Sequence, residues 1–540
     1  MNGQAIRQSS ETAPHTCKPR VLPKWLPAVC LLVIFALAFA IRLDAGLRKE
    51  LVGTDEARFL IAGRNFWRGK GLVVAPGQPY THSPALQGIV AAGIGKAIGT
   101  ADLQVANAIA FAVFGALGAV MVFVLAWRLF GEKTGLLTAA LYSVLPTLSV
   151  KVHYWNSTTE TLLLALVLAG CYGYLRYYEG KPLAWVGAGA AAFGVAAMAR
   201  MDGFVYLAVM TSLLALRKTF ARPGWFRPML APVLCSVLAF AAAYAPYGVM
   251  LWRCSGRFIP SVAGHTAAAY NPLRLSEDDL YAETMDAEES DTSFVRYALR
   301  EWPKYPRRMA ANLWIAFSRE TPDVVPFYLF PFVGLALFAD SETWRDRWRI
   351  LFLAATALPL MAYMLFYVQA RFLVVVLPAL LILAARGLLS VPWRSGATRP
   401  ALCVVVIVML IGEGRNQAHA LAMEAAHPEF RAAGKWIAAH SAESEFIMTR
   451  KPEVAYYADR PRARLPWTES IAELHAAALR AGVNCVVFDE KRSLPVRLPL
   501  KPLLDVEAMQ DDPWFEVFHA STEKGHRLVV LKPRQQAAAN

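Results

Sequence analysis

The sequence lacks the cysteine spacing of a metal site and has no internal repeat. Its seven cysteines show no metal-ligand spacing. Cys254 and Cys485 are expected on the same side of a membrane, where a disulfide between them is one option. Four others stand inside apolar runs and are expected to be small core residues: Cys30, Cys171, Cys235 and Cys403.

A concentrated basic patch is also missing, although the formal net charge is +14. The cations recur instead in short loops between apolar runs, which is the pattern of the positive-inside rule. We therefore attribute the charge to membrane topology and expect no nucleic-acid partner. These cations include Arg128, Lys133, Arg217, Lys218, Arg222, Arg227, Arg345, Arg347, Arg349, Arg386, Arg394 and Arg399.

What the chain has in abundance is apolar sequence, with 56% hydrophobic residues over 540 positions. The run from Trp25 to Ile41 follows Lys18, Arg20 and Lys24, which predicts a first transmembrane helix with a cytoplasmic N-terminus. A cleaved signal peptide is the alternative, because residues 36–40 are small. The length of the run and the many apolar runs after it favour a retained anchor.

Ten further apolar runs bring the expected number of spans to eleven. The runs 183–199 and 203–216 are short and rich in Gly and Ala, and could form a broken or tilted pair. A crossing at 84–98 would turn the basic loops outward, so we expect an interfacial amphipathic helix there. The ten runs are 103–127, 135–150, 159–175, 183–199, 203–216, 229–251, 324–339, 350–367, 371–385 and 400–412.

This arrangement predicts a polytopic α-helical membrane protein of about eleven spans with a C-terminal extracytoplasmic α/β domain. The expected parts are a cytoplasmic tail at 1–23, a transmembrane domain at 24–413 and a soluble domain at 414–540. Within the transmembrane domain, 43–102 forms the first outer loop and 252–323 a long outer loop. We expect a bacterial inner membrane, with the polar clusters and the C-terminal domain facing outside.

An acidic pair, Asp55 and Glu56, lies just outside the first span. Adjacent helical residues point about 100° apart, so one carboxylate can face a site while the other orients or binds. A carboxylate at a membrane surface is suited to act as the general base toward a hydroxyl. The alternative is an acidic helix start that is favoured by the helix dipole.

Several cations are expected at the outer ends of spans, although the positive-inside rule predicts few cations there. Each alone could be a snorkelling or anchoring side chain, but together they predict a phosphate site. Glu160 and Asp202 are further outer acids, and the simplest role for Asp202 is an ion pair with Arg200. The cations are His82, Lys151, His153, Arg200 and Arg371.

Four motifs resemble the GT-C fold glycosyltransferases that use polyprenyl-phosphate sugars, the glycosyltransferase family 39-like group. The protein O-mannosyltransferases and lipid A aminoarabinose transferases are the most similar. Residues 55–59 resemble the family's Asp-Glu-x-Arg-Tyr, and 80–86 resemble its Pro-Pro-Leu turn. Residues 200–203 resemble Arg-Pro-Glu-Gly, and 371–378 resemble a late Arg-Tyr span. Ser83 and the pair Met201-Asp202 depart from these patterns, which suggests a divergent subfamily.

The resemblance implies that Asp55 is the catalytic base of an inverting transfer to an acceptor hydroxyl on the outer face, and Glu56 is expected to be a second catalytic residue. It implies a polyprenyl-phosphate sugar donor and a protein, lipid or glycan acceptor, in contact with membrane lipid. No cofactor is expected to be required, and a divalent metal remains open. Donor phosphate-binding residues would be Arg58, His82, Lys151, His153, Arg200 and Arg371, with support from Tyr80, Glu160 and Asp202.

A transporter or flippase of a lipid-linked glycan or a solute is the alternative from another class. It would explain many spans and an outward polar vestibule. The spans carry almost no ionisable residues, however, and coupled transporters keep such residues near the midplane. A sensor domain on a membrane anchor would not require so many spans.

Overall fold

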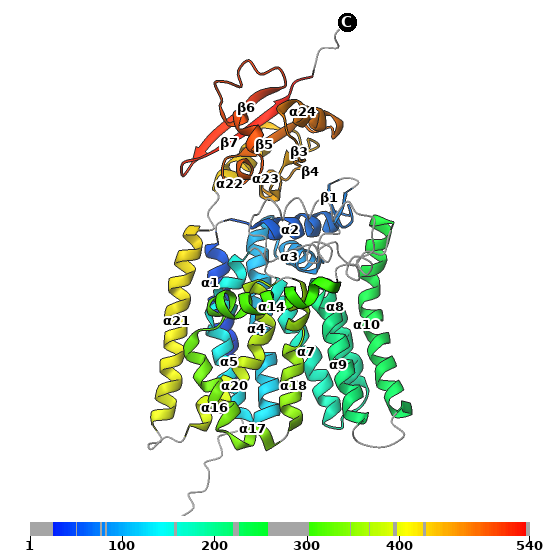
Figure 1. Cartoon of the computed structure of the whole chain (residues 1–540), viewed down its shortest axis with the longest axis vertical. Coiled ribbons are helices and arrows are strands. Elements are labelled where there is room, and N and C mark those ends of the chain that lie inside the picture. The colour runs from blue at the N-terminus through cyan, green and yellow to red at the C-terminus, as the bar shows by residue number, and fades with distance from the viewer. Residues whose placement is uncertain are drawn as a thin grey trace, which may run out of the picture.

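The computed structural model describes residues 25–49, 51–75, 78–80, 84–155, 159–219, 226–256, 302–345, 347–366, 368–391, 397–424 and 428–535. The expected tail at 1–23, His82 and most of the expected loop 252–323 lie outside the described residues. Figure 1 shows a bundle of long helices with a smaller domain at one end. We call the end that carries this domain the upper end.

The first half of the bundle contains α1 (Leu26–Arg48), α4 (Leu103–Phe130), α5 (Glu132–Val144), η1 (Thr147–Lys151), α6 (Val152–Tyr154), α7 (Thr159–Tyr178), α8 (Ala184–Ala199), α9 (Asp202–Thr219) and α10 (Phe226–Ser255). The second half contains η2 (Trp302–Lys304), α14 (Tyr305–Ile315), η3 (Ala316–Glu320), α15 (Thr321–Val324), η4 (Phe327–Leu329), α16 (Phe330–Phe338), α17 (Ser341–Arg345), α18 (Arg347–Ala357), α19 (Leu360–Phe366), η5 (Ala370–Val376), α20 (Leu377–Ser390) and α21 (Thr398–Glu424).

The number of spans differs from the expected eleven. All eleven apolar segments contain helix. Within the described residues, however, six helical stretches are long and apolar enough to cross a membrane, or up to eight if each bent pair counts as one span. The segments 184–199, 202–216 and 348–357 are apolar but shorter. Helix α21 also continues to Glu424, past the expected domain boundary at residue 413 and through Gly412 and Gly414.

At the break after α5, a buried side chain donates hydrogen bonds to backbone carbonyls that the helix leaves without a partner. Pro146 has no N–H group to bond the carbonyl of Tyr142 four residues earlier, and the axis bends by 52° between α5 and the next helical stretch. The guanidinium of Arg42 on α1 donates to the carbonyls of Tyr142 and Ser143, both at 3.1 Å. This fully buried cation therefore pairs with helix-end carbonyls that have lost their own donors.

Two helices cross at the upper end of the bundle, α2 (Thr54–Trp67) and α3 (Leu86–Ile98), with a short hairpin β1 (Val73–Ala75) and β2 (Gln78–Pro79) between them. Gly63 and Gly88 meet at the crossing, where a Cβ on Gly63 would lie 2.1 Å from the Gly88 carbonyl oxygen. The backbones can approach this closely only because both residues lack a side chain. The helix expected at 84–98 is α3.

The C-terminal domain contains a five-stranded sheet in the order β4-β3-β5-β7-β6. Strands β3 (Ile447–Thr449), β4 (Arg462–Arg464) and β5 (Cys485–Asp489) run parallel, while β6 (Phe515–Glu523) and β7 (His526–Pro533) form an antiparallel hairpin beside β5. Every residue of β5 is buried, as in strands covered on both faces. The remaining elements are α22 (Pro428–His440), α23 (Pro452–Ala458), α24 (Ile471–Arg480), η6 (Leu494–Val496) and η7 (Leu498–Leu504).

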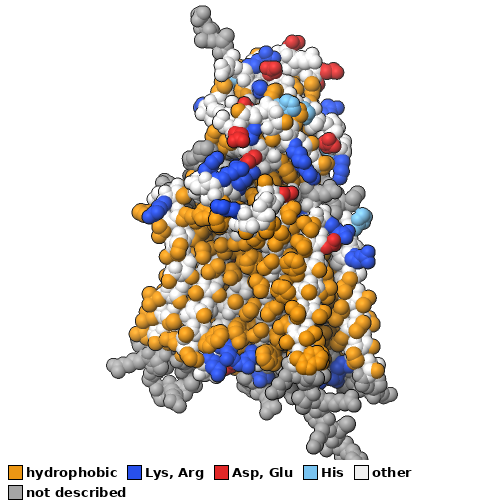
Figure 2. Space-filling view, turned by 180° about the vertical axis from the view of Figure 1, so that it is seen from behind, with side chains coloured by type: hydrophobic (Ala, Val, Ile, Leu, Met, Phe, Trp, Pro, Cys, Tyr) orange, Lys and Arg blue, Asp and Glu red, His pale blue; other side chains and the backbone are white. Residues whose placement is uncertain are grey.

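Cys485 is buried in β5, and Cys254 ends α10 near Gly71, and both thiols are free. The disulfide considered from the sequence is therefore absent. Figure 2 shows hydrophobic side chains over the middle of the bundle and Lys and Arg side chains at the end away from the C-terminal domain. This distribution is that of a membrane protein with a basic face.

Candidate active site

The local sequence explains why α2 begins just before the acidic pair. Gly53 is the N-cap residue, and its N–H donates to the carboxylate of Glu56 at 3.2 Å. This is the reciprocal half of a capping box, and both acids lie in the first turn, where the helix dipole favours negative charge. The alternative reading of the pair as an acidic helix start therefore applies to Glu56.

Asp55 turns away from this cap toward two arginines. Arg371, on η5, donates from its guanidinium to Asp55 Oδ2 at 3.1 Å. Arg58, one turn further along α2, places a guanidinium nitrogen 3.7 Å from Asp55 Oδ1. The Asp55 side chain is 36% exposed, so a carboxylate flanked by two partly exposed guanidinium groups remains accessible at the upper end of the bundle.

Glu56 is buried beneath it, with only 1% of the residue exposed. Its carboxylate accepts from Lys49 Nζ at 2.5 Å and from Asn107 Nδ2 on α4 at 2.6 Å. Burial alone would raise the pKa of Glu56, but the charge of Lys49 and the bond from Gly53 hold that pKa below its ordinary value. Glu56 is therefore an ionised anchor that ties α2 to the bundle.

A second network lies nearby around Arg200, at the turn between α8 and α9. Arg200 donates to Glu160 at 2.7 Å, to Asp202 at 3.0 Å and to the Tyr363 hydroxyl at 2.8 Å. The expected pairing of Arg200 with Asp202 is present, and Glu160 adds a second carboxylate. These two acids occupy the guanidinium of Arg200.

Phe372 connects this network with the Asp55 site. The guanidinium carbons of Arg200 and Arg371 each lie 5.2 Å from the centre of its ring, and the ring of Tyr363 stacks on it at 4.5 Å. Such cation–π contacts orient both guanidinium groups. Four chain segments that are far apart in the sequence thus meet here: the starts of α2 and α7, the α8–α9 turn and η5.

Of three other residues expected at the site, His153 and Tyr80 are buried and Lys151 is half-buried. His153 is 1% exposed and stacks on Phe111 at 4.7 Å, and its carbonyl accepts from Lys49 at 2.7 Å. Lys151 Nζ donates to the carbonyl of Asp323 at 2.5 Å. Tyr80 is 2% exposed within the apolar core of the bundle.

Sequence reasoning did not assign four residues that contact the site: Lys49, Asn107, Gln87 and Phe372. Gln87 Nε2 donates to Asn107 Oδ1 at 2.8 Å, which aims the Asn107 amide at Glu56. A lone Asn inside the long apolar helix α4 is the signal that could have indicated this partner. Among the described residues, no group of three His, Cys, Asp or Glu side chains is arranged as metal ligands.

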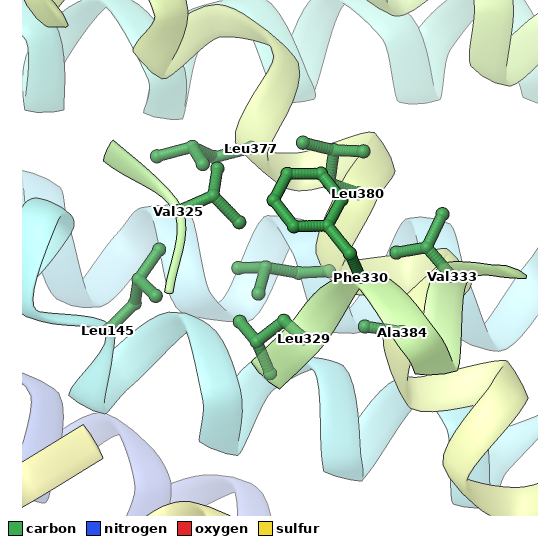
Figure 3. A pocket seen from close by; sticks show the side chains of 9 residues that line it. Leu145, Val325, Leu329, Phe330, Val333, Leu377, Leu380 and Ala384 are labelled. Carbon is green, nitrogen blue, oxygen red and sulfur yellow. The ribbon is translucent and has the colours of Figure 1, made fainter. Parts of the chain in front are cut away.

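A small pocket with an entirely apolar lining lies deeper in the bundle (Figure 3). Leu377 and Leu380 on α20 line it, and α20 continues directly from the η5 segment that carries Arg371. Leu145, Val325 and Phe330 lie opposite. Its volume of about 10 Å³ admits at most one water-sized group, so it carries no ligand assignment.

Comparisons with known proteins concern the fold and one segment of the chain. Residues 88–252 match the family model described as dolichyl-phosphate-mannose-protein mannosyltransferase. The structure is similar to that of ArnT from Cupriavidus metallidurans bound to undecaprenyl phosphate, with a TM-score of 0.59 and 14% identity over 94% of this chain and 98% of that one. No curated protein sequence matches significantly.

A second similar structure is the archaeal oligosaccharyltransferase AglB from Archaeoglobus fulgidus, in complex with an inhibitory peptide and a dolichol-phosphate. Its TM-score is 0.56, with 11% identity over 86% of this chain and 69% of that one. Identities this low establish the shared fold alone. The chain therefore has the fold of these two structures, and its residues 88–252 are similar to the mannosyltransferase family.

Proposed function

We propose that this glycosyltransferase moves a sugar from a polyprenyl-phosphate donor to an acceptor hydroxyl, with inversion and with Asp55 as the general base. The observation that carries the proposal is the division of the acidic pair. The buried Glu56 carboxylate already accepts hydrogen bonds from Lys49, Asn107 and the N–H of Gly53. The Asp55 carboxylate lies between Arg58 and Arg371 and is partly exposed to solvent. The solved relatives bound to undecaprenyl phosphate and dolichol-phosphate support this donor class.

In the reaction, Asp55 takes the proton of the acceptor hydroxyl as its oxygen attacks the anomeric carbon. The bond from that carbon to the phosphate oxygen breaks on the opposite face, and polyprenyl phosphate leaves as the second product. Arg371 is positioned to bind the phosphate bidentately and to stabilise its developing charge. Its contact with Asp55 is then a resting pair, which the donor phosphate would replace and so free the base.

The other expected phosphate ligands divide by their surroundings. Arg58 faces the same space as Arg371, and His82 remains a candidate from the sequence. Arg200, already bound by two carboxylates, would act through Phe372 on the orientation of Arg371. The sugar, the acceptor and any use of a metal are left for experiment.

The test is transfer by the purified full-length protein in liposomes, with a panel of polyprenyl-phosphate sugars. Asp55→Asn is expected to fold and to lower kcat by about 10²–10⁴-fold, the usual loss for a general base. The matched control is Asp44→Asn, because Asp44 is an exposed acid that pairs with Arg48 on the same helix. Asp44→Asn is expected to keep the wild-type rate.

Release of polyprenyl phosphate at the wild-type rate by Asp55→Asn would overturn the assignment of the base. Passage of intact sugar-lipid across the bilayer, with no covalent product from any donor, would favour the transporter alternative. A product with retained anomeric configuration would contradict direct displacement.

A further inference from the structure

The C-terminal domain contacts α2 through one face of the short helix α23. Glu453, Tyr456 and Tyr457 follow the i, i+3, i+4 spacing that places side chains on one side of a helix. Asp459 is the C-cap residue at the end of the same helix. The chain therefore presents two carboxylates and two aromatic rings to α2 over about two helical turns.

The first pair of contacts lies at the start of α2, just before the proposed base in the sequence. The N–H of Val52 donates to the Tyr457 hydroxyl at 2.8 Å. The Thr54 hydroxyl donates to Glu453 Oε1 at 2.7 Å. Thr54 precedes Asp55 directly, so these bonds fix the backbone from which the Asp55 side chain projects.

The second set lies at the far end of α2. Arg68 donates to both carboxylate oxygens of Asp459, at 3.0 and 2.8 Å, and Arg64 lies 2.9 Å from the same carboxylate. Asp459 has a φ of 51°, a conformation that Asp and Asn tolerate better than most residues. The Arg64 guanidinium also lies over the Tyr456 ring, 5.7 Å from its centre.

Apolar packing joins the same two elements. Tyr456 is 8% exposed and belongs to the main hydrophobic core cluster of the membrane bundle, although it is part of the C-terminal domain. From below, α2 is held by Glu56 and by the Gly63–Gly88 crossing with α3. From above, it is held by α23 at both ends. A shift of the C-terminal domain would therefore move α2 relative to η5.

We propose that α23 keeps α2 in register with Arg371, and that Asp459 and Tyr457 are positioning residues for the transfer reaction. This inference rests on the proposed function, because it treats Asp55 as the base. The physical reason is distance: Asp55 and Arg371 come from different segments, and a displacement of about 1 Å in a reacting group lowers rates by up to about 10²-fold. The C-terminal domain is then part of the active-site framework.

The test uses Asp459→Asn in the full-length protein, because Asn keeps the backbone conformation and removes the charge that binds Arg64 and Arg68. We expect kcat to fall on the order of tenfold, with the donor KM within about twofold of wild type. We also expect faster amide hydrogen exchange in α2. Asp511→Asn is the matched control, since Asp511 is an exposed acid of the same domain outside this contact.

A second variant addresses the other end of α2. Tyr457→Phe removes the hydroxyl that accepts from Val52 and is expected to lower kcat in the same direction. Arg68→Gln combined with Asp459→Asn is expected to be non-additive, because both changes break one contact. Wild-type kcat and wild-type exchange of α2 in both Asp459→Asn and Tyr457→Phe would overturn the positioning role.

The two proposals fail in different ways. A fully active Asp55→Asn would remove the proposed base, while faster α2 exchange in Asp459→Asn would still demonstrate that α23 holds α2. An inactive Asp55→Asn beside unchanged Asp459→Asn and Tyr457→Phe would leave the assignment of the base intact and remove only the positioning role.

Discussion

Asp55 and Glu56 show how two adjacent carboxylates acquire different chemistry from one helical turn. Their side chains diverge by about 100°, so Asp55 faces the accessible upper surface and Glu56 points into the bundle. Lys49 and Asn107 satisfy Glu56, and Arg58 and Arg371 flank Asp55. The same separation explains why only Asp55 is available to an acceptor hydroxyl.

Replacing the buried acid is expected to destabilise the fold. Glu56→Gln leaves the Lys49 ammonium buried without its counter-charge, a change that typically costs about 3–5 kcal/mol. Thermal unfolding in detergent measures the loss, with the exposed Glu516→Gln as a control that is expected to unfold like wild type. A Glu56→Gln protein as stable as wild type would contradict the anchor role.

The same variant should change the pH dependence of unfolding. The pKa of Glu56 is held below its ordinary value of 4.5 in the folded protein. Its stabilisation is therefore complete above that value and is lost as the pH falls through the lower folded pKa. The difference in unfolding temperature between wild type and Glu56→Gln is expected to shrink in that acidic range and to stay constant near neutral pH.

At the residue scale, sequence reasoning identified Asp55, Arg58 and Arg371, because charged side chains at the ends of apolar segments are conspicuous. It grouped His153 and Lys151 with them because all were placed at span ends. The sequence pattern places a residue near a span end but does not show which way its side chain points. The His153 ring stacks on Phe111 inside the bundle, and Lys151 donates to a backbone carbonyl. The partners of Glu56 come from segments far apart in the sequence, so spacing could not reveal them.

At the scale of elements, the close crossing of α2 and α3 fixes the position of α2, and with it the position of Asp55, relative to the bundle. Gly63→Ala would place a methyl group 2.1 Å from the Gly88 carbonyl oxygen, which is backbone and cannot swing aside. We expect the helices to separate, with a loss of about 1–3 kcal/mol of stability and reduced transfer. Gly334→Ala on α16 is the matched control, since a Cβ there meets nothing within 4 Å.

The control is expected to be neutral or slightly stabilising, because Ala favours helix over Gly by about 1 kcal/mol. Unfolding temperature and transfer rate are measured for both variants. Equal behaviour of Gly63→Ala and Gly334→Ala would show that the two backbones can separate without consequence for the site.

Elements were predicted well where apolar runs were long, and less well where they were broken. The eleven runs contain helix, yet Pro146 bends one and the 324–339 run belongs to a pair bent by 93°. Hydropathy does not reveal that a buried arginine, Arg42, supplies the donors that such a break requires. The contact between α23 and α2 was also not predicted, because α23 belongs to the C-terminal domain and α2 to the membrane bundle. Residues about 400 positions apart in the sequence make this contact, and no spacing rule connects them.

At the scale of the whole molecule, the elements of the candidate site and the C-terminal domain share one end, where Lys and Arg side chains are mixed with Asp and Glu. A further group of Lys and Arg side chains lies at the opposite end (Figure 2). A membrane protein with this polarity is expected to keep its basic end in the cytoplasm. The donor phosphate, the acceptor and the C-terminal domain would then meet on the outer side. The orientation of the bundle in the membrane therefore determines on which side of the membrane the proposed reaction occurs.

Cysteine labelling in intact cells tests this orientation. In a variant with the seven native cysteines replaced, Asp511→Cys in the C-terminal domain is expected to react with a membrane-impermeant maleimide. Lys133→Cys, at the start of α5 near the basic end, is expected to react only after the membrane is permeabilised. Both sites are exposed, so a difference in labelling reports the side of the membrane rather than burial. The opposite pattern would place the proposed base in the cytoplasm, and labelling of both sites in sealed cells would contradict a bundle with an intact barrier between its two ends.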